Sequence, residues 1–168
     1  MHLVVDGYNV MHALPIGREW PGRTFQDRRH HFLDRLGDYA AGRPHRVTVV
    51  FDGARGGDEM GGADWRGGVE VLYSARGADA DSLILRLLDA TPRVAAVLLV
   101  TSDKSLAGQA RSLGASTARA DELVKRLSPR GPQPGPESAA LFERRVKGFA
   151  PEAPRHAAPR SKSPLHLW

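Results

Sequence analysis

The sequence predicts an α/β fold with three α/β/α layers, in which helices cover both faces of a mostly parallel sheet. Two observations lead to this prediction. Short segments rich in Val and Leu alternate along the chain with segments in which apolar residues recur every three or four positions. The first pattern is typical of buried strands and the second of amphipathic helices. The length of 168 residues fits one domain of ordinary size.

The expected strands are short apolar runs bounded by Gly, Pro or Asp. They cover residues 2–5, 46–51, 69–74, 94–101 and, as a shorter strand, 116–119. Continuous apolar runs of this length are typical of strands that are buried on both faces of a parallel sheet.

The expected helices fill the intervals between these strands. The first begins after Thr24, a residue type that caps helices well, and ends at Gly42. Three more helices are predicted over residues 81–88, 104–113 and 121–127.

The composition changes at Pro129, so the predicted domain covers residues 1–128. The remaining 40 residues form a Pro-rich basic extension with eight of the twelve prolines, seven basic residues and three acidic residues. One helix is expected within it, over residues 137–149. The extension supplies most of the formal charge of +5, which suggests an anionic partner such as nucleic acid.

Several classes of protein are excluded by composition. The chain has no cysteine, which rules out disulfides and thiolate metal sites. The longest aliphatic run, residues 94–100, is far shorter than the roughly 18 apolar residues of a membrane helix. The N-terminus lacks the basic start and apolar stretch of a secretory signal, so we expect a cytoplasmic protein without a membrane partner. The oligomeric state is not predicted.

Acidic residues gather at the predicted carboxyl edge of the sheet, where open α/β folds bind ligands. Asp6, Asp52 and Asp103 follow three of the four main strands, and Asp79 and Asp81 stand where the helix after the third strand begins. Each Asp by itself is equally well explained as a turn or helix cap. Together, uncompensated carboxylates raise one another's pKa and need a cation. Oxygen ligands without cysteine favour Mg²⁺ or Mn²⁺.

Four short motifs resemble, in order and spacing, those of the NYN domain, a PIN-like nuclease superfamily, and especially its YacP-like branch. They are Asp6-Gly7-Tyr8-Asn9, Phe51-Asp52-Gly53, Ala80-Asp81 followed by Ile84, and Thr101-Ser102-Asp103. The resemblance covers about residues 1–127. It implies a Rossmann-like (PIN-like) sheet and a metal-dependent endoribonuclease. Some relatives act on ribosome-bound RNA, so RNA, including mRNA on the ribosome, is the implied partner.

The resemblance also implies roles for individual residues. Catalytic and metal-binding roles fall to Asp6, Asp81 and Asp103, with Asp52 as a direct or water-mediated ligand. The supporting residues that it implies are Asn9, Asp79, Thr101 and Ser102. Asp81 directly follows Ala and precedes Ile, as the acidic position of the family does, whereas Asp79 is a departure from the pattern. The expected reaction is in-line hydrolysis of a phosphodiester bond, assisted by Mg²⁺ or Mn²⁺.

Candidate RNA-binding residues are basic or aromatic. The segment 52–68 contains seven glycines and is expected to be a mobile loop beside the site. It is either a lid whose Trp65 stacks on a base or a connection whose Trp packs on the body. Basic residues on the first long helix either form a solvated face or reach the phosphates. The candidates are Arg28, Arg29, Arg55, Trp65, Arg66 and Lys104.

Two other functions remain open. A non-catalytic RNA-binding or ribosome-binding module of the same fold would use the basic extension and would bind RNA without its acidic residues. A Mg²⁺-dependent phosphatase of the haloacid-dehalogenase type also places an Asp after its first strand. Its Asp-x-Asp pair is missing here, because Gly7 and Tyr8 follow Asp6.

Overall fold

The computed structural model describes residues 1–15, 24–41, 43–53 and 62–128. Its strands are β1 (His2–Asp6), β2 (Arg46–Phe51), β3 (Gly62–Arg66), β4 (Val69–Tyr73), β5 (Val97–Val100) and β6 (Ser116–Ala118). Its helices are α1 (Gly7–Ala13), α2 (Phe25–Ala40), α3 (Ala80–Asp89), α4 (Lys104–Ser112) and α5 (Ala120–Leu127). The predicted Arg55 and the extension 129–168, with its helix over 137–149, lie outside the described residues.

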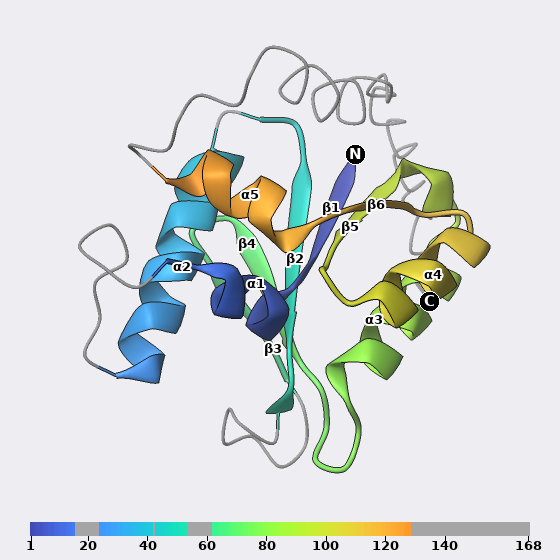
Figure 1. Ribbon diagram of the computed structural model, residues 1–168, viewed down its shortest axis with the longest axis horizontal. Helices are drawn as coiled ribbons and strands as arrows, with labels where there is room; N and C mark the ends of the chain where they lie inside the picture. The colour runs from blue at the N-terminus through green and yellow to red at the C-terminus, as the bar shows by residue number, and fades with distance from the viewer. Residues whose placement is uncertain (16–23, 42, 54–61, 129–168) are drawn as a thin grey trace, which may run out of the picture.

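The six strands form one sheet in the order β3-β4-β2-β1-β5-β6 (Figure 1). All neighbouring strands are parallel except β3 and β4. From β1 the chain adds β2 and β4 on one side and then crosses over to add β5 and β6 on the other. The strand order therefore reverses between β1 and β5, which is where sheets of this kind bind ligands at their carboxyl edge.

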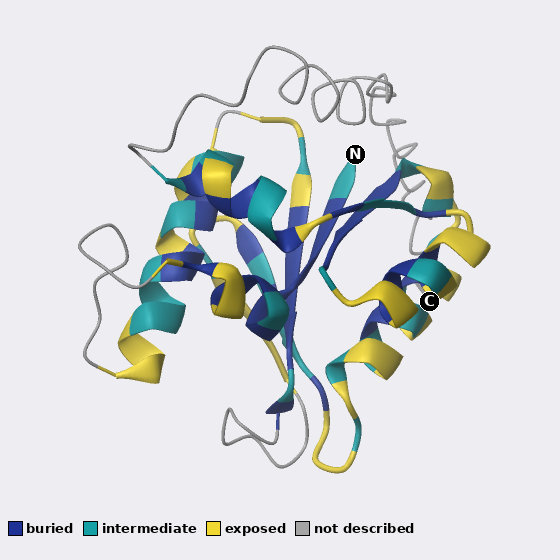
Figure 2. Cartoon of the chain, in the orientation of Figure 1, coloured by how far each residue is buried: buried dark blue, intermediate teal, exposed yellow. Residues whose placement is uncertain are grey.

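Helices cover both faces of the sheet, so the expected α/β/α layers are confirmed (Figure 1). Residues alternate along β1 between two cores: Leu3 and Val5 pack with α1, α2 and α5, and Val4 packs with α3 and α4. All three are at most 1% exposed, and the central strands β1, β2 and β5 are buried along most of their length (Figure 2). Each such side chain stabilises the fold by about 1.5–3 kcal/mol.

The sequence predicts no helix between the strand over residues 2–5 and Thr24, so helix α1 differs from the prediction. It starts directly after β1, with Asp6 as its N-cap. Gly7 is required there, since a Cβ at this position would collide with the Phe51 ring. The helix has seven residues, too few for its periodicity to be evident in the sequence.

The interpretation of residues 62–66 as part of a mobile loop was wrong. They form β3, an antiparallel edge strand that pairs with β4. Gly67 and Gly68 make the two-residue turn between them, with φ values of 57° and 80°. Consecutive positive φ values are those of a tight hairpin turn, in which glycine is the least strained residue. A Gly-Gly pair between two strands is the sequence signal of this hairpin.

The other elements lie within a few residues of their predicted bounds. The largest difference is at the fourth main strand, where Val94–Ala96 form a 3-10 turn and β5 begins only at Val97. In the described part of the chain, no helix is long and apolar enough to cross a membrane.

Candidate acidic active site

Asp6 lies at the centre of the carboxyl edge, as the last residue of β1. It is only 7% exposed. Its Oδ1 accepts a hydrogen bond from the Asn9 backbone N–H at 3.4 Å, and its Oδ2 accepts one from the Thr101 hydroxyl at 2.8 Å. Both carboxylate oxygens are therefore held in place, one by α1 and one by the segment after β5.

Asp103 faces Asp6 across the point where the strand order reverses. It caps α4, since its Oδ1 accepts a hydrogen bond from the Leu106 N–H at 2.9 Å. Its own N–H donates to the Thr101 hydroxyl at 3.0 Å. One hydroxyl group thus contacts both Asp6 and the backbone of Asp103, which fixes the position of the two acidic residues relative to each other.

Asn9 and Ser102 extend this network to the neighbouring helices. The Asn9 side-chain oxygen accepts a hydrogen bond from the Ser102 N–H at 2.8 Å, joining α1 to the segment after β5. The Ser102 hydroxyl accepts one from the Ala120 N–H at 3.2 Å, joining that segment to α5. The expected supporting residues Asn9, Thr101 and Ser102 therefore lie together with the acidic residues.

Asp79 and Asp81 differ in their surroundings. Asp79 is the N-cap of α3, and its Oδ1 accepts a hydrogen bond from the Ser82 N–H at 2.6 Å. A hydrogen bond with the Ser82 side chain, and then this backbone bond, lower the pKa of Asp79. Burial raises the pKa of Asp81, and the carboxylates of Asp103 and Asp79 raise it further. These surroundings favour Asp81 as the member of the acidic group, whereas Asp79 caps α3.

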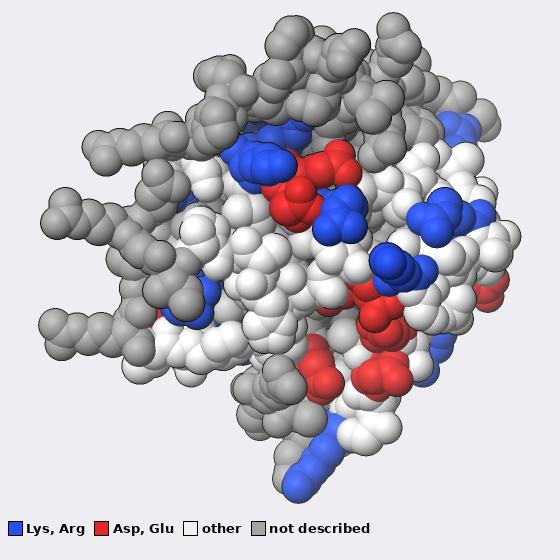
Figure 3. Space-filling model, in the orientation of Figure 1, with Lys and Arg blue, Asp and Glu red and all other residues white. Residues whose placement is uncertain are grey.

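The pKa of Asp6 is shifted mainly by burial, and the other acidic residues add a smaller contribution. Burial raises the pKa of Asp6 to about 6; the bonds from Thr101 and Asn9 oppose this rise, and Asp81 and Asp103 add to it. Within the part of the chain that the structure describes, Asp6, Asp81 and Asp103 form no ion pair with a Lys or Arg. Acidic side chains gather near the starts of α3 and α4 (Figure 3). Such an uncompensated group favours a bound cation.

The chemistry of these donors fits a hard divalent cation, because all of them are oxygens. The acidic residues are nevertheless spread apart in the described structure. Across residues 1–15, 24–41, 43–53 and 62–128, no three His, Asp or Glu side chains come together closely enough to hold a metal ion as a set. A metal ion therefore fits the kind of ligand present, and the carboxylates do not form a closed cage.

Asp52 stands apart from this group. It directly follows β2, the neighbour of β1, and so lies on the same edge of the sheet. It is not among the carboxylates that shift the pKa of Asp6 or Asp81. Asp81 and Asp103, by contrast, both raise the pKa of Asp6.

Arg29 reaches the carboxyl edge from α2. Its guanidinium carbon lies 5.8 Å from the ring centre of Phe51 and 5.6 Å from that of Tyr73, the last residues of β2 and β4. These cation–π contacts hold the charge against aromatic faces. Arg28 is half-buried, and among the described residues its side chain makes no hydrogen bond or ion pair.

Trp65 and Arg66 do not lie beside the acidic group, so the lid interpretation was wrong for them. In the β3–β4 pairing they stand opposite Glu70 and Val69, at the amino-terminal end of β4. Arg66 forms an ion pair with Asp34 of α2 at 2.6 Å, while Trp65 is 62% exposed. Their distance from the carboxyl edge follows from the antiparallel direction of β3.

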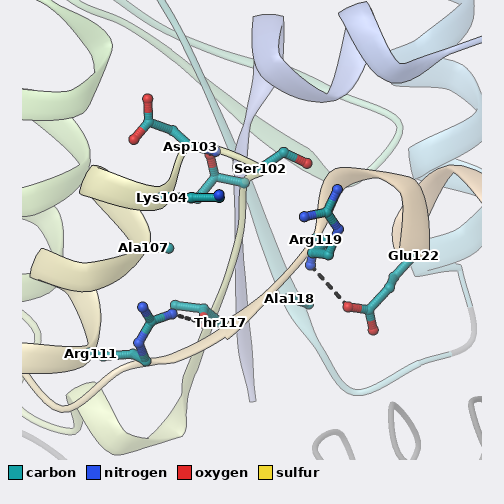
Figure 4. A pocket seen from close by; sticks show the side chains of 10 residues that line it. Ser102, Asp103, Lys104, Ala107, Arg111, Thr117, Ala118, Arg119 and Glu122 are labelled. Carbon is teal, nitrogen blue, oxygen red and sulfur yellow. Dashed lines mark hydrogen bonds between the residues drawn. The ribbon is translucent and has the colours of Figure 1, made fainter.

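A cavity of about 440 Å³ opens beside Asp103, between α4, β6 and the start of α5 (Figure 4). Lys104, Arg111 and Arg119 contribute cations to its wall. Sequence reasoning identified Lys104 and missed the two arginines. The spacing of Lys104 and Arg111 was an available signal, because residues seven positions apart lie on one face of a helix.

Comparison with known proteins agrees with the fold and the motifs. The sequence model of the YacP-like NYN domain matches residues 3–133. The "Uncharacterized protein YacP" of Bacillus subtilis is 29% identical over 154 residues, covering 90% of this chain and 85% of that protein.

Solved structures of the same relative are similar as well. The crystal structure of a point mutant of Rae1 (YacP) from Bacillus subtilis superimposes with a TM-score of 0.61 at 26% identity, covering 88% of this chain and 82% of the other. A second crystal structure of Rae1 (YacP), 24% identical, gives a TM-score of 0.60 with coverages of 88% and 80%, and bears on the fold alone.

Proposed function

The chain belongs to the YacP-like NYN domain family, and from this membership we propose that it is a divalent-metal-dependent endoribonuclease. Its substrate is RNA, including mRNA on the ribosome, and its compartment is the cytoplasm. The cofactor is Mg²⁺ or Mn²⁺. The products expected from in-line hydrolysis are 5′-phosphate and 3′-hydroxyl ends.

One observation carries this proposal. The buried carboxylate of Asp6 is held at the point where strand order reverses, close enough to Asp81 and Asp103 for both to raise its pKa. No basic side chain among the described residues pairs with any of the three. Burying such a charge is costly without a partner, so the site favours a cation that the protein itself does not supply.

Each residue of the site has a task in the proposed reaction. Asp6, Asp81 and Asp103 would hold the metal ion, which supplies activation of a water molecule and neutralisation of charge on the phosphate. Thr101 and Asn9 keep the Asp6 carboxylate in one orientation. Arg29 and Lys104 bind phosphates of the RNA from the two sides of the site. Asp52, which follows the neighbouring strand β2, would contact the metal ion directly or through a water molecule.

The test is cleavage of single-stranded and structured RNA with Mn²⁺, with Mg²⁺ and with EDTA. Asp6→Asn, Asp81→Asn and Asp103→Asn should each lose about 100-fold or more of the cleavage rate. Asp89→Asn, at the other end of α3, is a matched control that removes an exposed carboxylate and should keep wild-type activity. Full activity in the three site variants would contradict the proposal.

A second candidate is a non-catalytic RNA-binding module of the same fold. The open arrangement of the acidic residues favours it, since the described residues contain no closed set of metal ligands. This candidate requires RNA binding that is independent of metal and that survives replacement of Asp6, Asp81 and Asp103, with no cleavage under any condition. Release of phosphate from a small ester without RNA cleavage would instead favour a phosphatase.

A further inference from the structure

A cavity lies beside Asp103 at the carboxyl edge of the sheet. We propose that it holds an internal nucleotide of single-stranded RNA, next to the cleaved bond, whose phosphate binds Lys104, Arg111 and Arg119. This inference rests on the proposed ribonuclease function, which it extends from the reacting phosphate to the grip on the neighbouring nucleotide.

Two cations of α4 form one wall of the cavity. Lys104 and Arg111 are seven residues apart, so they lie on the same face of the helix about 10 Å from each other along its axis. The Lys104 ammonium makes no hydrogen bond or ion pair with any described residue. Arg111 donates one side-chain hydrogen bond to the Thr117 hydroxyl at 2.9 Å and pairs with no acid in the described ranges. Their charges are available to an anion.

Arg119 forms the opposite wall, where β6 leads into α5 (Figure 4). Its Nε donates to Asp121 at 2.9 Å, and the arginine side chain is 64% exposed. An ion pair this exposed is worth about 0–1 kcal/mol, so Asp121 competes only weakly with a phosphate for the guanidinium group. The bond orients the guanidinium group while its two terminal nitrogens remain for a phosphate.

Among the described residues that line the cavity, three cationic side chains outnumber two carboxylates, those of Asp103 and Glu122. Figure 4 shows the Asp103 carboxylate pointing away from the centre of the cavity, whereas Lys104 points inward. Glu122 accepts a hydrogen bond from the Arg119 backbone N–H at 3.1 Å. The interior therefore presents ammonium and guanidinium groups to a ligand.

The size and lining of the cavity indicate a phosphate and sugar more than a stacked base. Its volume of about 440 Å³ is within the range of ligand sites, about 300–1,000 Å³. None of the described residues that line it is aromatic, so this part of the wall offers no stacking platform. The hydroxyls of Ser102 and Thr117 are suited to the hydroxyl groups of a ribose.

The position of the cavity, beside Asp103, indicates that it takes the nucleotide next to the reacting phosphate. Asp103 belongs to the acidic group, and Lys104 is the next residue, so the cavity begins where the acidic group ends. A phosphate bound by Lys104 is then close to the reacting one. A cavity that takes one nucleotide favours an unpaired strand, because nucleotides of a duplex stay paired and stacked.

The experiment measures RNA binding without metal. A short single-stranded RNA with a 5′-hydroxyl and a 3′-fluorescein is titrated with the full chain in EDTA, and fluorescence anisotropy is recorded at several salt concentrations. The variants are Lys104→Gln, Arg111→Gln and the double variant. Arg86→Gln is the matched control, since it removes an exposed cation from α3, outside the cavity.

We expect each single variant to bind about 5-fold more weakly and the double variant about 20-fold more weakly. Each lost phosphate contact should also reduce the salt slope by about 0.7. The control should stay within about 2-fold of the wild type. Both replaced side chains are exposed, so the variants should have the wild-type melting temperature. Wild-type affinity and salt slope in the double variant would overturn the proposal.

A further arm, with an RNA that carries a 5′-phosphate, separates the alternatives. If the variants lose affinity only for an RNA that carries a 5′-phosphate, the cavity binds a chain end and the internal nucleotide is ruled out. Because the titration is done in EDTA, its outcome does not depend on cleavage. Failure of the proposed function would appear separately, as absence of metal-dependent cleavage by the wild-type chain.

Discussion

The hydroxyl of Thr101 donates a hydrogen bond of 2.8 Å to the buried carboxylate of Asp6, 95 residues away in the sequence. The same hydroxyl accepts a hydrogen bond from the backbone N–H of Asp103. Thr101 thus joins the ends of β1 and β5 across the point where the strand order reverses. The orientation of one proposed ligand and the position of another depend on a single side chain.

Thr101→Val tests this dependence, since it keeps the shape of the side chain and removes the hydroxyl. The hydrogen bond lowers the pKa of Asp6, so its loss should move the acid limb of the pH–rate profile to higher pH. Activity should fall about 10–100-fold, as for other residues that orient metal ligands, and stability by about 1–2 kcal/mol. Thr101→Ser should restore both. An unmoved acid limb in the Val variant would show that Thr101 acts on stability alone.

Asp6→Asn should raise the stability of the metal-free protein at pH 7.5. The pKa of Asp6 is about 6 in the folded protein and about 3.9 in an unfolded chain. Ionisation therefore favours the unfolded state: the cost is absent below pH 3.9, grows as the pH rises towards 6 and is complete above it. The asparagine removes a cost of about 3 kcal/mol. Thermal unfolding in EDTA should show a higher Tm for the variant at pH 7.5 and a much smaller difference at pH 4.

Addition of Mn²⁺ or Mg²⁺ should reverse this order. A ligand that binds only the folded protein stabilises it by about 2.7 kcal/mol at 100 times its Kd. The wild type should therefore gain Tm with increasing metal concentration, while Asp6→Asn and Asp103→Asn should gain little. Ca²⁺ and high NaCl serve as controls for effects of ionic strength. Equal metal-dependent gains in all three proteins would remove Asp6 and Asp103 from the proposed metal site.

The sheet and the acidic edge could be predicted from sequence because they depend on local signals. Buried parallel strands are continuous apolar runs, and an Asp that follows each run marks the carboxyl edge. The resemblance implies supporting roles for Asn9 and Ser102. In the structure, their hydrogen bonds join α1 and α5 to the segment after β5.

The missed features depend on tertiary contacts. Arg29 was ambiguous because periodicity does not reveal that the Phe51 and Tyr73 rings lie under it. The position of Arg66 depends on the antiparallel direction of the edge strand β3. The position of Arg111 in a cavity wall depends on the packing of α4 against β6 and the start of α5. Pairwise proximity of this kind is set by packing between distant segments, which a single sequence does not display.

Asp79 and Asp81 should give opposite results when each is changed to alanine. Asp79→Ala removes the N-cap of α3 and should lower the stability of the protein, with little effect on RNA cleavage. Asp81→Ala should abolish metal-dependent cleavage without loss of stability, because it removes a carboxylate whose pKa is raised by its neighbours. Chemical denaturation and a cleavage assay on both variants compare the two effects. Loss of cleavage in the Asp79 variant alone would assign the metal to Asp79.

At the opposite edge of the sheet, His2 should make stability fall in mild acid. The Thr48 hydroxyl donates to Glu70 at 2.6 Å, so at 2.7 Å it accepts from the His2 Nε2–H. Burial, and then the charge of Arg46, lowers the pKa of His2 to about 4. Its neutral form contributes stability that is complete above the unfolded pKa of about 6.5 and is lost as the pH falls towards 4. After allowance for solvent screening we expect a loss on the order of 1 kcal/mol. The free energy of unfolding from pH 7 to pH 4 should fall less in His2→Gln than in the wild type, and equal slopes would exclude His2 as the titrating group.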